Sequence, residues 1–329
     1  MMGNGAEEEK MKFIRRALAV ALLLTSGLAI AAFPDKPVKI IIGFPAGGPL
    51  DAHARVLADQ ASKVLGQPVV IDYKAGAGGT IGADFVSKSP ADGYTLLMAN
   101  TGTMVINPFI YRNSYDTLRD FTPIARTAQQ PLALVVNPAV PAKTLAEFID
   151  LAKKNPGKYN YGSAGTGGIS HLVPEMLQSA TGIQIVHVPY KGSAPAFTDL
   201  LAGQVQFIAE SIPQVAQYVK IGKVRALAMT GPERNAAIPE VPTMREAGVR
   251  DFEVVGFYGL LAPPRLPADI TATLTQAFQK VLVTEDVRSR MLQQGADPAY
   301  LDAAAFGAYL KAQLLRWGAA VSKAGVKLE

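Results

Sequence analysis

Short apolar runs rich in β-branched residues alternate with longer stretches of helical periodicity along this 329-residue chain. Near the N-terminus, strands are predicted at 38–42, 69–73 and 95–99, with helices at 51–65 and 82–88. A further strand at 133–136 opens a second set, with predicted helices at 144–154, 170–181, 194–202 and 212–221 and predicted strands at 158–162, 185–188, 205–208 and 226–229. This alternation predicts an α/β fold whose parallel sheet is joined by crossover helices.

The length of the chain favours two lobes, because about 300 residues exceed one ordinary core. We expect residues 32–134 and 254–329 to form lobe 1, and residues 135–253 to form lobe 2 as an insertion. Segment 252–261 is predicted to be an extended return path, and three amphipathic helices at 269–284, 286–294 and 303–324 should then pack on lobe 1. Segments 132–137 and 252–258 would form a hinge, and the cleft between the lobes is the expected ligand site.

The N-terminus is typical of a cleaved export signal. Lys12, Arg15 and Arg16 precede an apolar run and a small-residue stretch that ends Ala29-Ile30-Ala31-Ala32. The apolar run is too short for a stable membrane span, so residues 1–31 are predicted to be a signal peptide removed near Ala31 or Ala32, which places the protein in the periplasm. Residues 1–10 fit poorly before such a signal, and Met11 is an alternative start.

Composition excludes several classes of protein. The absence of cysteine excludes disulfides, thiolate metal sites, cysteine nucleophiles and a lipidated cysteine anchor. The formal net charge of +5 is mild and evenly spread, which argues against a nucleic-acid partner and is compatible with a small anionic ligand.

Two glycine-rich corners link a predicted strand to a predicted helix. The first contains Gly47 and Gly48 and ends at Asp51, and the second is 162–170. Glycines let backbone N–H groups approach a ligand, and a helix N-terminus favours an anion, so opposed corners could each hold one carboxylate. In the second corner the hydroxyls of Ser163, Thr166 and Ser170 would fix its orientation. The alternatives are that Asp51 only satisfies first-turn amides, and that Ser163 and Ser170 only cap the following helix.

Enzymatic readings of the sequence find little support. Gly76-Ala77-Gly78-Gly79-Thr80-Ile81-Gly82 matches a dinucleotide-binding turn weakly, and no acidic residue follows the next strand to meet a ribose. There is no G-x-S-x-G elbow and no H-E-x-x-H pattern. His53, His171 and His187 are far apart in the sequence; His53 and His171 could reach the cleft, but lone histidines are usually structural. Zinc is poorly supported, and no catalytic residue, metal or cofactor is predicted.

Several motifs together resemble the extracytoplasmic solute receptors of tripartite tricarboxylate transporters, the Bug-type periplasmic binding proteins. The resemblance runs along the whole mature chain. The segments that support it are Phe33-Pro34-Asp35-Lys36-Pro37, 44–51 with Ala54-Arg55, Leu65-Gly66-Gln67-Pro68-Val69-Val70, 76–83, Ala91-Asp92-Gly93-Tyr94-Thr95-Leu96, Tyr161-Gly162-Ser163-Ala164-Gly165 with His171-Leu172, Val188-Pro189-Tyr190-Lys191-Gly192-Ser193-Ala194-Pro195, and Pro239-Glu240-Val241-Pro242-Thr243 with Glu246-Ala247-Gly248.

The resemblance implies a type II periplasmic binding protein fold that closes on a small carboxylate without transforming it. It implies membrane transporter subunits as partners, and we expect a monomer. The candidate ligand-binding residues are Phe44, Ala46, Gly47, Gly48, Pro49, Leu50, Asp51, Asn100, Thr101, Thr103, Ser163, Gly165, Thr166, Gly167, Gly168, Ser170, His171, Ser193, Ala194, Glu210 and Phe257.

Some of these positions keep alternatives. Asn100 either lines the cleft or is only a turn residue, and Lys191 is by default solvated. Glu210 stands where these receptors usually have an aspartate, and either shapes its loop or accepts a ligand hydroxyl. Phe257 and Tyr258 either floor the pocket or pack the hinge.

Two departures from the family pattern affect the choice of ligand. Pro49 and Leu50 replace a usual hydroxyl pair, and Gly168 stands where a serine is common. Aromatic carboxylates are therefore candidate ligands together with aliphatic dicarboxylates such as malate or adipate. A carboxylate-sensing receptor that signals to a membrane kinase is an alternative to a role in uptake.

Overall fold

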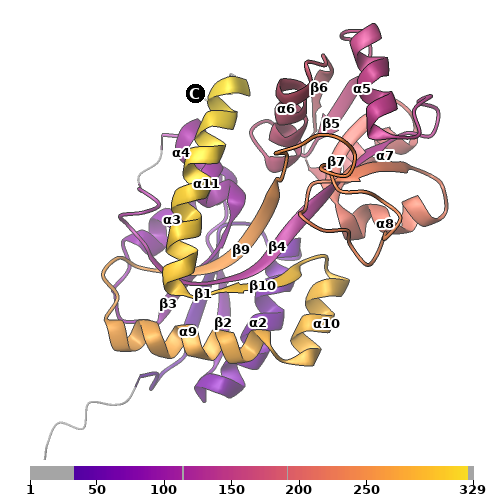
Figure 1. The fold of residues 1–329 in the computed structure, drawn as a ribbon. Coiled ribbons are helices and arrows are strands. Elements are labelled where there is room, and N and C mark those ends of the chain that lie inside the picture. Colours follow the sequence, from indigo (N-terminus) through magenta and orange to yellow (C-terminus); the bar gives the residue numbers. More distant parts are fainter. Residues whose placement is uncertain (1–32, 113–114, 191, 325–329) are drawn as a thin grey trace, which may run out of the picture. The chain divides into compact units, whose positions relative to one another are not determined.

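A β-sheet with helices on its faces organises the residues described by the computed structural model, which are 33–112, 115–190 and 192–324 (Figure 1). The described residues from Lys36 onward belong to one compact unit. The signal-peptide prediction concerns residues 1–31 and lies outside the described residues. Among the described residues, no helix is long and apolar enough to cross a membrane.

The first part of the sheet is parallel, as the sequence predicts. Strand β1 (Val38–Ile42) lies between β2 (Val69–Tyr73) and β3 (Thr95–Asn100). Helix α2 (Pro49–Leu65) connects β1 to β2, and a short 3₁₀ turn, η1 (Ala77–Gly79), with helix α3 (Thr80–Ser87) connects β2 to β3. Residues 40–42 are fully buried, which explains the unbroken apolar run of β1.

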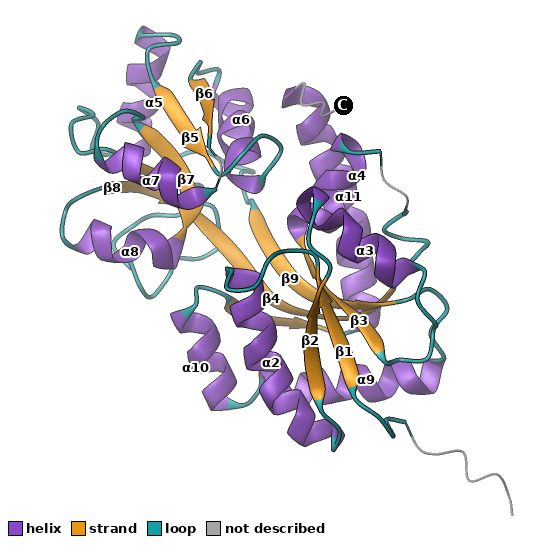
Figure 2. Cartoon of the chain, turned by 180° about the vertical axis from the view of Figure 1, so that it is seen from behind, coloured by secondary structure: helices purple, strands orange, loops and turns teal. Residues whose placement is uncertain are grey.

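The sheet is mixed, whereas the alternation of strands and helices predicts a parallel one. Strand β9 (Val255–Ala262) pairs antiparallel with β3 and with β4 (Thr122–Val136), and β4 in turn pairs antiparallel with β7 (Phe207–Ser211). The two long strands lie side by side and continue the sheet from its first part to its second (Figures 1 and 2). Hydrophobic periodicity reports which faces are buried but not strand direction, so this reversal was not visible in the sequence.

The second part of the sheet repeats the strand and helix alternation. Strand β5 (Asn160–Ser163) pairs in parallel with β7 and β6 (Val186–Pro189), and β8 (Arg225–Met229) pairs antiparallel with β4. The helices of this part are α5 (Leu145–Lys154), α6 (Ile169–Thr181), α7 (Ser193–Leu201) and α8 (Ile212–Lys220). Phe148 of α5 stacks on Phe207 of β7 with ring centroids 5.1 Å apart, which places α5 on one face of the sheet.

The C-terminal residues form three helices, close to their predicted bounds: α9 (Ala268–Leu282), α10 (Glu285–Gln293) and α11 (Ala303–Ala324). α9 and α10 pack on α2, whereas α11 contacts both β4 and α6. Strand β10 (Asp297–Leu301), which pairs with β4, was not predicted. Nor were a π-helical turn, η2 (Gly102–Ile106), and the short helix α4 (Asn107–Ile110) that follows β3.

Candidate functional site

A cavity of about 370 Å³ lies where the loops after β1, β3 and β5 meet the ends of β4 and β7. The candidate residues that line it are Phe44, Asn100, Gly165, Thr166, Gly167, Gly168, Ser170, Ser193 and Glu210. Residues that line it without having been predicted are Gly78, Gly102, Asn107, Ile110, Tyr111, Leu132, Ala164, Ile169 and Ala209. The site thus combines loops that are up to about 170 residues apart in the sequence, with the carboxyl ends of strands as in other open α/β sheets.

The first glycine corner contributes only Phe44 to this cavity. Ala46, Gly47, Gly48, Pro49, Leu50 and Asp51 do not line it. Asp51 does not cap α2 either, because the N-cap is Gly48 and makes no side-chain bond. The carboxylate instead reaches back, so that the Gly47 amide donates to its Oδ2 over 2.8 Å. That amide is therefore not free to meet a ligand.

Asp51 is the centre of a hydrogen-bond cluster that fixes this corner. Tyr73 donates its hydroxyl to Oδ1 over 2.8 Å, and Arg55 donates from Nε to the same oxygen over 3.0 Å. Burial alone would raise the pKa of the Asp51 carboxyl, but the bonds from Gly47, Tyr73 and Arg55 outweigh it and hold the pKa below its ordinary value of 3.8. The ionised form is the one that orders the corner.

Replacing Asp51 with asparagine tests this cluster. We expect Asp51→Asn to lower the free energy of unfolding by about 1–2 kcal/mol at pH 7, because a buried charge-assisted acceptor is lost. The folded pKa is depressed, so the stabilisation is complete above pH 3.8 and disappears as the pH falls through the lower folded pKa. Urea denaturation at pH 7 and near pH 3 measures both effects. Asp59→Asn is the matched control, because that side chain is 60% exposed in its ion pair, and an equal loss there would contradict the argument.

The second glycine corner lines the cavity and is fixed by hydroxyls inside the loop. Ser170 Oγ accepts from the Ala164 amide over 3.0 Å, and Ser163 Oγ contacts both the amide and the carbonyl of Gly165. The alternative that these serines cap α6 was wrong, since Gly168 is the N-cap and makes no side-chain bond. Ser163, 1% exposed, does not line the cavity and acts on the loop from behind.

The Thr166 amide has no acceptor among the described residues, and Thr166 lines the cavity. This N–H and those of Ile169 and Ser170 in the first turn of α6, which also have no acceptor among the described residues, are the main-chain donors that this corner can offer to an anion.

Two histidines that are distant in the sequence meet behind this loop. The rings of His171 on α6 and His187 on β6 stack with centroids 3.9 Å apart, and Tyr161 stacks on His187 at 4.9 Å. Burial lowers the pKa of both, and the neighbouring His171 helps bring that of His187 to about 4. His171 is 6% exposed and does not line the cavity. Its sequence position, two residues into a predicted helix, gave no sign of His187.

His53 does not reach the cavity. It is fully buried on α2, its Nε2 lies 2.8 Å from Thr127 Oγ1, and its ring packs 5.0 Å from that of Tyr258. Burial lowers its pKa to about 3, so it is neutral at physiological pH. Its role is structural, and within the described residues no group of three or more His, Asp or Glu side chains is placed to hold a metal ion.

The residues of the turn after β3 divide between the cavity and the core. Asn100 lines the cavity and its Oδ1 also accepts from the Thr103 amide over 2.8 Å, so it is a turn residue that faces the site. Thr101 and Thr103 are buried outside the cavity, where Thr101 Oγ1 accepts from the Phe257 amide. Asn107 was missed because it follows an unpredicted π-helical turn; its Nδ2 donates to the Gly78 carbonyl over 2.9 Å.

The remaining candidates also divide. Ser193 at the start of α7 lines the cavity, whereas Ala194 does not, and Lys191 lies outside the described residues. Glu210 on β7 also lines the cavity, and its Oε1 accepts a hydrogen bond from the Ser211 amide. Phe257 is fully buried against Phe306 at 5.6 Å, and is therefore part of the core rather than the cavity floor.

The cavity's chemistry suits a small polar ligand with an apolar body. Phe44, Ile110, Tyr111, Leu132 and Ile169 supply apolar and aromatic surface. Asn100, Asn107, Thr166, Ser170 and Ser193 supply neutral hydrogen-bonding groups, and within the described residues no lysine or arginine lines it. An anion held here must therefore be held by amides, hydroxyls and the N-termini of α6 and α7.

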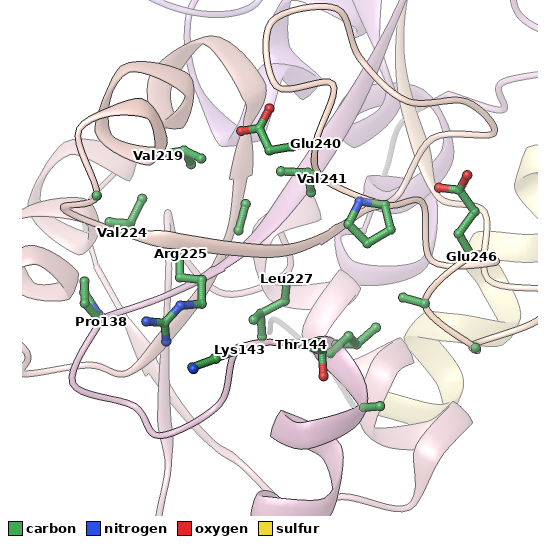
Figure 3. Close-up of a pocket in the computed structure, with 17 residues that line it drawn as sticks. Pro138, Lys143, Thr144, Val219, Val224, Arg225, Leu227, Glu240, Val241 and Glu246 are labelled. Carbon is green, nitrogen blue, oxygen red and sulfur yellow. The ribbon is translucent and has the colours of Figure 1, made fainter.

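A larger cavity of about 880 Å³ lies elsewhere, and all of its lining residues fall between Pro138 and Gly248 (Figure 3). It contains Lys143 and Arg225 but also Glu240 and Glu246. Arg225 is already engaged, since its Nη1 donates to the carbonyls of Val140 and Ala142. The balanced charges and the absence of any strand-end glycine corner make it a weaker candidate for an anion site.

Comparison with known proteins places the chain in a class. The model of the tripartite tricarboxylate transporter family receptor matches residues 53–326. The structure resembles the periplasmic binding protein BugD, with 35% identity and a TM-score of 0.75 over 90% of this chain and 100% of that one. The fold is therefore that of a periplasmic solute-binding receptor, as expected, and the chain belongs to the tripartite tricarboxylate transporter receptor family.

Two further relatives were solved with ligands. A protein of R. palustris with adipate is 32% identical, with a TM-score of 0.78 over 90% of this chain and all of that one. MatC from Rhodopseudomonas palustris with bound malate is 32% identical, with a TM-score of 0.74 over 88% of this chain and all of that one. The family and the fold are those of binding receptors rather than enzymes.

Proposed function

We propose that this protein binds a small carboxylate in the 370 Å³ cavity and releases it unchanged. The observation that favours this most is the convergence of the second glycine corner, Asn100 and Ser193 on one cavity, where amides, hydroxyls and two helix N-termini are available to an anion. The relatives solved with adipate and with malate support a carboxylate as the ligand class. Both aliphatic and aromatic carboxylates suit the mixed lining.

Glu210 argues for an asymmetric ligand. Its carboxylate faces the cavity, and a second carboxylate group placed beside it would be repelled. We infer that the ligand presents its negative end to Thr166 and the N-terminus of α6, and a hydroxyl or an apolar part to Glu210. The aspartate usual at this position in the family would sit further back by one methylene.

We further propose that the two parts of the sheet are the lobes expected from the sequence, 32–134 with 254–329 and 135–253. The cavity takes lining residues from both, including Phe44 and Asn100 from the first and Thr166 and Glu210 from the second. Closure of the lobes on a ligand would then bury it, with β4 and β9 as the connecting segments. A single monomer would suffice.

In this proposal the protein works outside the cytoplasm and delivers its ligand to membrane subunits of a tripartite tricarboxylate transporter. Membership of the receptor family supports that partner. The predicted signal peptide at residues 1–31 supports export to the periplasm.

A thermal-shift screen across mono-, di- and tricarboxylates tests the proposal. We expect one clear stabiliser, because a ligand that binds only the folded state raises the melting temperature. At a concentration of 100 times its Kd, such a ligand raises the free energy of unfolding by about 2.7 kcal/mol. The screen should include malate, adipate, benzoate and a benzenedicarboxylate, with the corresponding amides as neutral controls. A flat response to all the acids, or equal stabilisation by the amides, would refute carboxylate binding.

A further inference from the structure

Two hydrogen bonds behind the cavity give the second glycine corner its shape. The Gly167 amide donates to His171 Nδ1 over 3.0 Å, and His187 Nε2 lies 2.7 Å from Ser163 Oγ. The first bond requires Nδ1 to be unprotonated, so the proton of neutral His171 is on Nε2. Ser163 Oγ can donate to the Gly165 carbonyl while accepting from the Gly165 amide and from His187 Nε2. With both imidazoles neutral, all of these bonds are satisfied.

The same device in the first corner does not titrate near neutral pH. There the Gly47 amide donates to Asp51, four residues on and at the third position of α2. In the second corner the Gly167 amide donates to His171, again four residues on and at the third position of α6. The acceptor is a carboxylate in one case and an imidazole in the other, and only the imidazole gains a proton in mildly acidic solution.

We propose that His171 and His187 are positioning residues for the ligand loop 163–168, and that this loop loses its binding shape when His171 gains a proton. A proton on His171 Nδ1 removes the acceptor of the Gly167 amide. A second cation stacked 3.9 Å away would be repelled by the first, so protonation separates the rings and moves Ser163. The Thr166 amide then leaves its position at the cavity. This inference rests on the proposed carboxylate binding and adds a dependence on pH.

The groups around the pair shift the pKa of His187 in opposite directions. Glu175 on α6 accepts from the Tyr161 hydroxyl of β5 and favours a cation at His187, but burial and the second imidazole outweigh it. On β7, Glu210 faces the same cavity as the loop, and Arg316 and Lys323 of α11 lie with Glu175 around a separate surface cavity. The pKa of both histidines is below the ordinary 6.5, so the loop is intact at neutral pH.

Ligand affinity should therefore fall in acid. A ligand that needs an unprotonated His171 Nδ1 binds fully at pH 7.5 and loses affinity as the pH falls through the pKa of His171, which burial holds below 6.5. We expect the affinity of the wild-type protein to fall more steeply in acid than that of a variant whose residues at these two positions do not titrate. The wild-type protein and the variants should be titrated with the carboxylate that stabilises it, beginning with adipate and malate.

Two conservative substitutions keep the hydrogen bonds of these side chains but remove their titration. His171→Asn keeps an acceptor in the place of Nδ1, and His187→Gln keeps a donor in the place of Nε2, but neither titrates. The double variant should bind within about threefold of wild type at pH 7.5, and in acid it should lose only the affinity that protonation of the carboxylate ligand itself removes. His171→Leu should weaken binding at least tenfold at every pH. His53→Gln, which removes the histidine remote from the cavity, is the matched control and should keep the wild-type pH profile.

A measurement without ligand makes the outcome independent of the proposed function. Nitrogen-15 NMR of the histidine rings should show His171 protonated on Nε2 at pH 7.5, and the Gly167 amide resonance should shift as His171 titrates. The proposal is overturned if His171 carries its proton on Nδ1, or if the double variant loses affinity with acid as steeply as wild type. If no carboxylate binds at any pH, the proposed function fails, and the NMR titration still decides whether the histidines position the loop.

Discussion

A Gly167→Val variant is expected to bind its carboxylate at least 100-fold more weakly while remaining folded. Gly167 has a φ of +82°, a region that costs an L-residue about 1–2 kcal/mol and a β-branched residue more. The backbone would leave this conformation, so the Gly167 amide would lose His171 and the Thr166 amide would turn away from the cavity. A 100-fold loss is about 2.7 kcal/mol, which isothermal titration calorimetry measures directly.

The other end of the same helix offers the matched control. Gly182 ends α6 with a φ of +74°, and a Cβ added there meets nothing within 4 Å. Gly182→Val should therefore suffer a comparable backbone cost in stability, yet bind the ligand as tightly as wild type. If Gly167→Val bound normally, the second corner would have no part in binding. If both variants bound poorly, the loss would be one of general stability.

Among glycine-to-alanine substitutions in the chain's first β-α-β unit, Gly43→Ala is expected to lower the free energy of unfolding most. A Cβ on Gly43 would lie 2.6 Å from both the Cα and the carbonyl oxygen of Gly79, and neither atom can rotate away. The end of β1 and η1 would have to separate, which would also displace Phe44 at the cavity. We expect the free energy of unfolding to fall by about 3 kcal/mol, the upper part of the usual range for overpacking. Urea denaturation monitored by far-UV circular dichroism measures this loss.

Gly307→Ala is the control for that experiment. Gly307 lies inside α11, and its added Cβ would be 3.5 Å from Pro123 Cγ, an ordinary contact. Alanine is the better helix former, so this variant should be more stable than wild type by about 0.5–1 kcal/mol. A Gly43→Ala protein as stable as wild type would show that the strand end and η1 are not in close contact in solution.

Local signals predicted much of this fold. Strands β1 and β2 and helix α11 have the predicted bounds, because burial of an apolar face leaves a periodicity in the sequence itself. The glycine corners were also visible, since glycine is the residue that adopts a positive φ most readily. The short strand β10 was not, because its five residues are all only partly buried and show no apolar alternation.

For the cavity, residue type alone was not enough. Thr101 and Thr103 follow β3 and have suitable chemistry, yet Thr101 Oγ1 accepts from the Phe257 amide and Thr103 Oγ1 donates to the Gly78 carbonyl. Phe257 lies within β9 and is buried in the core. Asn107 and Tyr111 line the cavity from the two ends of α4, a short helix that follows the π-helical turn, and neither element has a distinctive sequence pattern. Whether a side chain points inward or backward depends on a rotation of the backbone that spacing does not specify.

The sequence by itself determined the alternation of strands and helices, the position of the glycine corners and the family. These depend on interactions within a few residues, or on many motifs in a fixed order. Only the tertiary structure decided the direction of β9 and β4, the partner of each loop amide, and the meeting of His171 with His187. Those pairings join residues that are distant along the chain, and their energy depends on a geometry that exists only after the strands have assembled.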